Sequence, residues 1–120
     1  FHGAEDNDLG YRLLEAGYRI HYVPEAGLYH RAWRGAQDYV RTRWIYGYCQ
    51  GAFYAKYLSL RDPYMLRRMA RDLFRHAKRL PLRIVRLEQQ WLYRDSAFIL
   101  GLLTGAAKWL VTQRTLRRTP

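Results

Sequence analysis

The chain has 120 residues, of which 49% are hydrophobic and 26% charged, a composition that excludes a disordered segment and supplies enough apolar side chains for a packed core. Lysine and arginine total 21 against 10 acidic residues, so the formal net charge of +11 predicts an anionic partner, which leaves phosphates, an acidic membrane surface and nucleic acid open. The single cysteine, Cys49, excludes an internal disulfide, fits a reducing compartment and is expected to pack in the core.

The predicted elements begin with a short helix opened by acidic residues. Behind Glu5, Asp6 and Asp8, apolar side chains recur at helical spacing, and Gly17 stands where a helix C-cap is wanted. The segment 18–23 then alternates aromatic or aliphatic side chains with basic ones and stops at a proline. That alternation predicts a half-buried strand.

Three further helical segments are predicted. Residues 35–60 lack proline and carry Gly47 and Gly51, whose spacing allows another element to approach closely. Asp62–Pro63 marks a boundary, after which 64–80 forms a basic amphipathic helix. Its apolar stripe comprises Leu66, Met69, Leu73, Ala77 and Leu80. Pro81 is expected to interrupt this helix, and a second helical stretch follows over 82–111. The apolar part of that stretch, 96–111, is shorter than the ~20 residues that a membrane-spanning helix needs. It therefore predicts contact with a membrane interface.

The stretch 3–30, GAEDNDLGYRLLEAGYRIHYVPEAGLYH, resembles family 2 glycosyltransferases, which carry ED-x-DL-x-x-R, AGY-x-I, VPEA and a following histidine. The resemblance implies a fold that is mainly α with a short β segment, the C-terminal part of the α/β GT-A (nucleotide-diphospho-sugar transferase) fold. Residues 1–60 would complete the catalytic domain, and 61–120 would form basic and apolar C-terminal helices that contact a membrane or cover the catalytic core. The family's nucleotide-binding half, with its DxD motif, would precede these residues, so we expect the 120 residues alone to be inactive.

The resemblance also implies site residues. Asp6 would be the general base, Glu5 its neighbour that helps position the acceptor, and His30 a ligand that joins the DxD acids in holding a divalent cation, Mn²⁺ or Mg²⁺. The alternative is that the acids only cap a helix and favour its positive end, with Asp8 the best capping candidate. A histidine such as His30, without a second ligand nearby in the sequence, is otherwise structural or exposed.

Basic and aromatic residues after the motif give weaker predictions. Arg31 and Arg34 are candidates for the donor phosphates because guanidinium groups offer bidentate donors, whereas Arg43 is expected on a solvated or membrane-facing surface. Arg43 and Trp44 supply the RW of the Q-x-x-RW motif of processive members, but Val40 stands in place of the glutamine. Processive synthesis is therefore not expected, and Trp44 is either a core residue or an acceptor platform.

The sequence thus predicts an inverting glycosyltransferase that moves a sugar from a nucleotide-sugar donor to a hydroxyl of a glycan or lipid-linked acceptor. We expect it in the cytoplasm, peripheral on the inner face of the cell membrane. The alternative is a basic amphipathic module that binds a membrane surface without catalysis of its own. No nucleic-acid partner is expected, because no RNP-like, zinc-finger or helix-turn-helix signature is present in the sequence.

Overall fold

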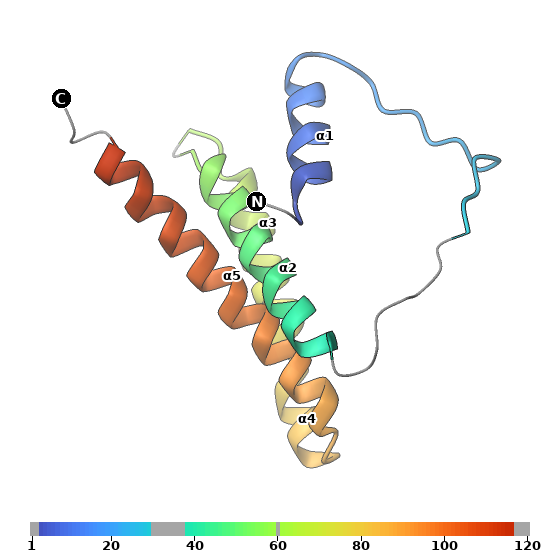
Figure 1. Ribbon diagram of the computed structural model, residues 1–120, viewed down its shortest axis with the longest axis vertical. Helices are drawn as coiled ribbons and strands as arrows, with labels where there is room; N and C mark the ends of the chain where they lie inside the picture. The colour runs from blue at the N-terminus through green and yellow to red at the C-terminus, as the bar shows by residue number, and fades with distance from the viewer. Residues whose placement is uncertain (1–2, 30–37, 60, 117–120) are drawn as a thin grey trace.

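The computed structural model describes residues 3–29, 38–59 and 61–116, and the side chains among them as far as residue 113. Five helices make up most of these residues: α1 (Glu5–Glu15), α2 (Tyr39–Lys56), α3 (Tyr64–Ala77), α4 (Leu80–Val85) and α5 (Gln89–Leu116). Figure 1 shows α2 and α5 side by side, while α1 and the segment that follows it stand off to one side. The mainly helical part of the predicted fold class is confirmed.

α1 is the helix that the acidic cluster predicts. Its first turn carries three carboxylates, which suit the positive end of the helix dipole, although no side chain caps it through a hydrogen bond. The helix ends at Gly17, whose φ of 85° lies in the left-handed region that glycine tolerates. The amides of Gly17 and Tyr18 donate to the carbonyls of Leu14 and Leu13, the paired hydrogen bonds of a Schellman motif.

The strand predicted over 18–23 is wrong. These residues are irregular and their side chains are exposed, including Ile20 and Tyr22. The segment leads away from the helices (Figure 1), and no residue in the described ranges forms a strand. A strand is stabilised by pairing with a neighbour, and three or more strands or a packed helix are needed for independent stability. Without a partner, the alternating pattern produces an extended segment with solvent on both faces.

α2 and α5 run parallel and touch through glycines. Gly47 and Gly51 of α2 face the backbone of α5, and Gly101 and Gly105 of α5 face the backbone of α2. A Cβ atom added at Gly51 would lie 1.9 Å from the Leu102 carbonyl oxygen. The close approach predicted from the spacing of Gly47 and Gly51 is therefore confirmed, and a matching glycine pair on α5 completes it. Such paired small-residue motifs are typical of closely crossing helices.

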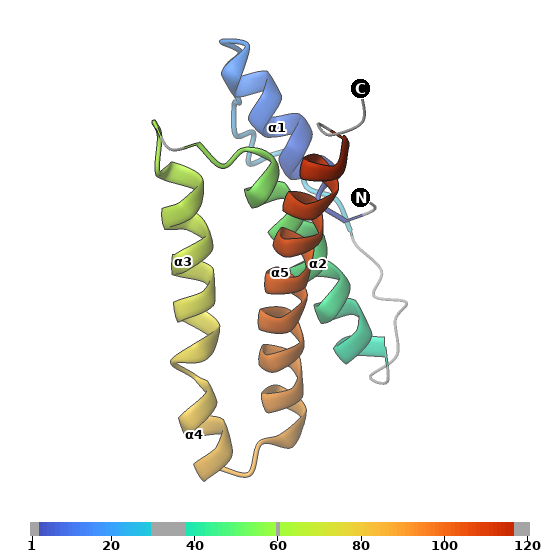
Figure 2. The same ribbon diagram turned by 90° about the vertical axis from the view of Figure 1, so that its left-hand side faces the viewer.

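α3 completes the core, and the apolar stripe predicted on it is confirmed in part. The core cluster is formed by Tyr54, Met65, Phe98 and Leu102, and Met69 and Leu73 of the stripe pack against it. Leu66 and Ala77 of the stripe are exposed, and their neighbours Met65 and His76 are buried instead. His76 Nδ1 pairs with the buried Asp95 Oδ1 of α5 at 2.7 Å. Figure 2 shows α3 running opposite to α5.

The interruption predicted at Pro81 is confirmed, because α3 ends at Ala77 and α4 begins at Leu80. Pro81 lies in the first turn of α4, where a helix does not need the missing N–H group. The single helix predicted over 82–111 is wrong, because the chain turns again at 86–88, between α4 and α5. Leu87 takes the left-handed conformation there, with a φ of 54°. Its amide and that of Glu88 close a second Schellman pair of hydrogen bonds.

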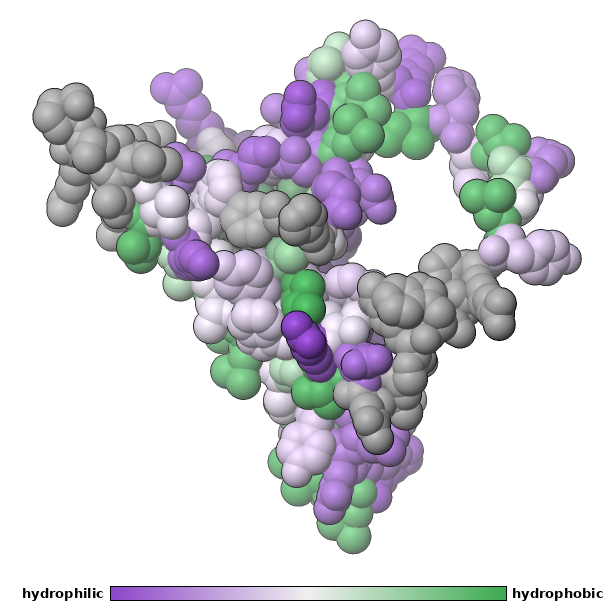
Figure 3. Space-filling model, in the orientation of Figure 1, coloured by the Kyte–Doolittle hydropathy of each residue, from purple (hydrophilic) through white to green (hydrophobic). Residues whose placement is uncertain are grey.

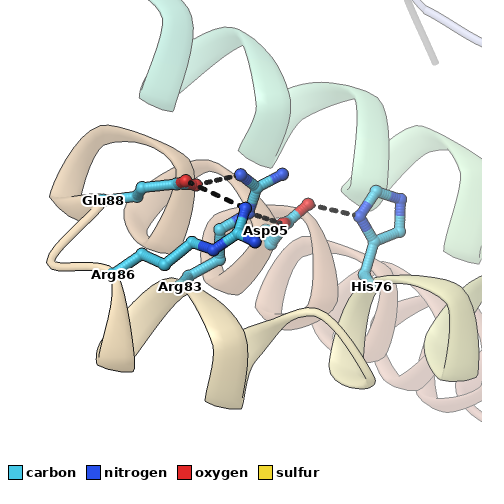
Figure 4. Close-up of polar contacts among 5 residues, drawn as sticks. All are labelled: His76, Arg83, Arg86, Glu88 and Asp95. Carbon is cyan, nitrogen blue, oxygen red and sulfur yellow. Dashed lines mark hydrogen bonds and ion pairs between the residues drawn. The ribbon is translucent and has the colours of Figure 1, made fainter.

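An ionic network joins α3, α4 and α5 beside this turn (Figure 4). Arg83 of α4 donates to the Glu88 carboxylate and lies 3.8 Å from Asp95 Oδ2, while His76 pairs with the other oxygen of Asp95. Arg86 lies 4.0 Å from Glu88. His76 therefore has a structural role, as one of the groups that hold α3 against α5.

Candidate functional site

A cavity of 760 Å³ lies between α1, α2 and α3. Figure 3 shows the molecule hollowed on this side, where α1 and the segment after it stand away from the other helices. The wall formed by α1 carries Asp6 and Tyr11, the wall formed by α2 carries Arg43 and Tyr54, and α3 contributes a row of arginines. The cavity therefore brings the acidic motif of the first fifteen residues against a basic surface more than sixty residues further along the chain.

Asp6 is an exposed carboxylate on the cavity wall. It lies in the first turn of α1, and no hydrogen bond or ion pair joins it to another residue in the described part of the chain. Its helix is held in place by its neighbours, because the Asn7 amide donates to Gln50 Oε1 at 2.9 Å and the Tyr11 ring packs on Tyr57 at 4.3 Å between centroids. Asp6 is thus left accessible to a molecule in the cavity.

Asp8 docks α1 rather than capping it, so its capping prediction is wrong. The Lys56 ammonium donates to its carboxylate at 2.6 Å, and the Tyr57 hydroxyl donates to the same oxygen at 2.9 Å. The hydrogen bond from Lys56 is the main reason why the pKa of Asp8 lies below its usual value of 3.8. The side chain projects from the second half of the first turn toward α2, where it finds a cation and cannot reach back to the free amides.

Glu5 faces a different hollow from Asp6. It accepts a hydrogen bond from the Gly3 amide and lines a smaller cavity of 230 Å³, together with Cys49 and Lys56. Adjacent helical residues point about 100° apart around the axis, so neighbouring acids on α1 meet different surroundings. Cys49 itself is 4% exposed, which confirms the predicted packing role.

Arg43 is drawn inward, and its predicted place on a solvated surface is wrong. Its guanidinium stacks over the Phe98 ring at 5.2 Å, and its Nε atom is buried with no hydrogen-bond partner among the described residues. Burial is the main reason why the pKa of Arg43 is lowered, and the positive charges of Arg94 and Arg79 lower it further. The close packing of α5 against α2 brings Phe98 over this arginine, which is half-buried.

The acids and arginines of the opposite wall are only partly paired. Tyr54 donates to Asp72 at 2.5 Å, and Arg75 lies 3.9 Å from the same carboxylate. Burial and this hydrogen bond raise the pKa of Tyr54 to about 12, so the phenol stays protonated. Arg68 and Arg79 also line the cavity, and no ion pair joins them to an acid in the described part of the chain.

The other predicted site residues do not join this cavity in the described structure. His30, Arg31 and Arg34 lie outside the described residues. Trp44 is 41% exposed, stacks on Tyr48 at 5.2 Å between centroids and is not part of the cavity lining. Among the residues that the structure describes, no three His, Cys, Asp or Glu side chains come together as a potential metal site.

Sequence reasoning missed the arginines of the α3 wall as site residues. Arg68, Arg75 and Arg79 follow one another at intervals of seven and four, which places them on one face of a helix. The seven- and four-residue spacing of these three arginines, which Arg67 and Arg71 do not share, could have indicated a common basic surface. Its meaning depends on α1 lying opposite, which no local pattern encodes.

Comparison of the chain with known protein families, with characterised proteins and with solved structures found no match. Within the described ranges, none of the helices combines the length and the apolar character needed to cross a membrane. The functional argument therefore rests on the motif residues and on the geometry of the cavity.

Proposed function

We propose that this chain is part of an inverting glycosyltransferase that transfers a sugar from a nucleotide-sugar donor to a hydroxyl group of a glycan or lipid-linked acceptor. The observation that carries the proposal is the position of Asp6, an accessible carboxylate on the wall of a 760 Å³ cavity. Asp6 is also the residue to which the family resemblance assigns the base. In this proposal the cavity is the acceptor site.

The chemistry requires a base at this position. A sugar hydroxyl is a weak nucleophile, and a carboxylate that takes its proton while the new C–O bond forms contributes about 10²–10⁴-fold to the rate. The bond from the anomeric carbon to the nucleoside diphosphate breaks as the acceptor oxygen attacks from the opposite face, so the configuration inverts. Asp6 receives the hydroxyl proton, and the diphosphate leaves with the bonding electrons.

Two further predicted roles remain part of the proposal. Glu5 would help to position the acceptor from the neighbouring hollow that it lines. The divalent cation, Mn²⁺ or Mg²⁺, would be held by His30 with acids outside this chain, and when bound it would neutralise charge on the departing nucleotide. The described residues alone do not supply a ligand set for it.

The test compares transfer and donor binding by the intact protein and its Asp6→Asn variant. Transfer is expected to fall by about 10²–10⁴-fold, because the amide cannot accept the proton, while donor binding is retained. Asp38→Asn is the matched control, since Asp38 is an exposed carboxylate at the start of α2 and is not part of the cavity lining. It is expected to keep the wild-type rate. His30→Ala is expected to weaken the dependence on the cation. Wild-type transfer by Asp6→Asn would overturn the proposal.

A membrane-surface module is the second candidate, favoured by an exposed apolar surface at the α4 end of the molecule. This surface, the apolar tip, consists of Leu82, Ile84, Val85 and Leu87, which are 50–81% exposed. Arg79 and Arg86 flank it and suit the anionic headgroups of an inner membrane face. The segment 96–111, for which the sequence predicts interfacial contact, buries Phe98 and Leu102 against α2 and leaves Leu100 and Leu103 about half exposed. Vesicle binding together with unimpaired transfer in Asp6→Asn would favour this candidate.

A further inference from the structure

The cavity carries more positive than negative charge. Four arginines, Arg43, Arg68, Arg75 and Arg79, line it against two aspartates, Asp6 and Asp72. Asp72 is already engaged by the Tyr54 hydroxyl and lies near Arg75. The remaining arginines therefore present unneutralised donors to whatever occupies the space.

Arg43 shows that the positive charge is crowded and lacks an acceptor. Its buried Nε has no hydrogen-bond partner in the described structure, and Arg94 and Arg79 oppose its charge while Asp95 favours it. A buried donor without an acceptor is costly, and each such group in a folded protein calls for an explanation such as a bound ion or ligand. An anion in the cavity, beside the guanidinium group of Arg43, would relieve this repulsion.

We propose that this cavity binds the phosphate group of a phosphorylated acceptor between Arg43 of α2, Arg68 of α3 and Arg79, which lies between α3 and α4. The planar donors of several guanidinium groups match the oxygen atoms of a phosphate, and they keep their charge at all relevant pH values. With the phosphate held on the α3 side, the acceptor hydroxyl is directed toward Asp6 on the α1 side. This inference rests on the proposed function, because it assigns the phosphate to the acceptor.

The test measures pyrophosphate binding to the intact protein by isothermal titration calorimetry at fixed ionic strength. The double variant Arg68→Gln/Arg79→Gln is expected to bind on the order of a hundredfold more weakly, about tenfold per lost charge-assisted contact. The matched control is Arg67→Gln/Arg71→Gln, on the same helix, with the same change in net charge and with both residues outside the cavity lining. Its affinity is expected to stay at the wild-type value.

Equal weakening in the two double variants would show that binding follows net charge alone, and it would overturn the inference. An absence of pyrophosphate binding in the wild type would do the same. Both double variants change exposed or half-exposed side chains, and their circular dichroism spectra establish that each is folded. Arg43→Lys is a further check, because it keeps the charge and loses the planar guanidinium donors, so weaker binding is expected.

Competition then identifies the source of the phosphate. Glycerol phosphate and a short-chain phosphatidic acid differ only in acyl chains, so stronger competition by the phosphatidic acid identifies a lipid-borne phosphate, and equal competition identifies a soluble one.

The experiments distinguish failure of the phosphate site from failure of the catalytic proposal. If pyrophosphate binding depends on Arg68 and Arg79 while Asp6→Asn keeps full transfer, the phosphate site stands and the catalytic proposal fails. If Asp6→Asn loses transfer while both double variants bind pyrophosphate equally, the catalytic proposal stands and the phosphate site fails.

Discussion

Leu87 holds a backbone conformation that side chains with a Cβ atom rarely adopt. Its φ of 54° ends α4 at a position where most helices carry glycine, and its side chain is 81% exposed. For an L-residue this conformation costs roughly 1–2 kcal/mol. Leu87→Gly is therefore expected to raise the free energy of unfolding by about 1 kcal/mol, measured by urea denaturation. Leu87→Ala, which keeps the Cβ atom, should show no comparable gain, and a gain as large as that of glycine would contradict this explanation.

Asp95 is a buried carboxylate that joins three helices through its ionic partners. It is 4% exposed, and its oxygens face His76 and Arg83 from two different helices. A buried carboxylate without such partners would be strongly unfavourable, because its hydration is lost. His76 is buried to meet this requirement, whereas its neighbour Ala77 of the predicted stripe is exposed.

α1 is a lightly attached element, and its attachment depends on pH. No residue of α1 is buried, and Asp8 with its Lys56 and Tyr57 partners provides its ionic contact with α2. Because the pKa of Asp8 is lowered, this contribution is present above pH 3.8, the usual aspartate value, and is lost as the pH falls through the lower folded value. The pKa of Lys56 is raised, chiefly by the hydrogen bond to Asp8, so its contribution is lost only as the pH rises beyond 10.5.

We therefore expect α1 to loosen in acid. A titration followed by nuclear magnetic resonance should show the Asp8 carboxyl carbon titrating below 3.8, with α1 amide signals shifting over the same range. Asp8→Asn should weaken the docking by about 1 kcal/mol at neutral pH and abolish the acid transition of α1. An unchanged acid transition in that variant would assign the effect to another group.

The α2–α5 contact gives the second expectation for an element. Gly51→Ala would place a Cβ atom 1.9 Å from a backbone oxygen of α5, so the two helices must separate and expose Leu102 and Tyr54. We expect a loss of about 3 kcal/mol or more in the free energy of unfolding, measured by urea denaturation. Gly10→Ala is the matched control, because the nearest atom to its added Cβ is Ile20 Cδ1 at 3.9 Å. That change should stabilise α1 by about 0.5–1 kcal/mol.

The elements that the sequence predicts correctly are those set by local signals. The acidic opening and Gly17 define α1, and Pro63 precedes α3, whose first amide donates to Asp62 Oδ1 at 2.9 Å. Over the described residues, the helix predicted at 35–60 is confirmed as Tyr39–Lys56. Whether 18–23 forms a strand could not be predicted from local signals, because a strand depends on a partner strand that its own residues do not specify. The role of Gly105 was missed for the same reason, since its spacing has meaning only where α2 meets α5.

At the scale of the whole molecule, the sequence predicted Asp6 but not the surface opposite it. The motif made Asp6 a candidate through residues that are adjacent in the chain. Arg43 gains its burial from Phe98, more than fifty positions away, and Arg79 joins the cavity only because α3 folds back beside α2. Local sequence patterns predict neither the burial of Arg43 nor the position of Arg79. The metal prediction at His30 stays a prediction, because that residue lies outside the described structure.

The shape of the whole molecule also determines how it would meet a membrane. α4 joins α3 to α5 at one end of the molecule (Figure 1), so the apolar tip lies at that end. Arg79 and Arg86 flank α4 in the sequence. That arrangement lets the apolar side chains enter the interface while the guanidinium groups stay among anionic headgroups. Leu87, in its left-handed conformation, lies in the turn that follows α4. Its conformation costs about 1–2 kcal/mol, and burial of its side chain in lipid would offset that cost.

We expect the intact protein to sediment with vesicles of phosphatidylcholine and phosphatidylglycerol, and Val85→Asn/Leu87→Asn to weaken that binding by at least about tenfold, because two apolar side chains no longer enter the interface. Asparagine tolerates the left-handed conformation at residue 87 and leaves the net charge unchanged. Leu100→Asn/Leu103→Asn is the matched control, since both leucines are about half exposed on α5, away from the tip, and this variant should bind as the wild type does. Equal loss in the two variants would mean that the molecule binds without a preferred end, and binding that disappears in high salt would then assign the attraction to net charge alone.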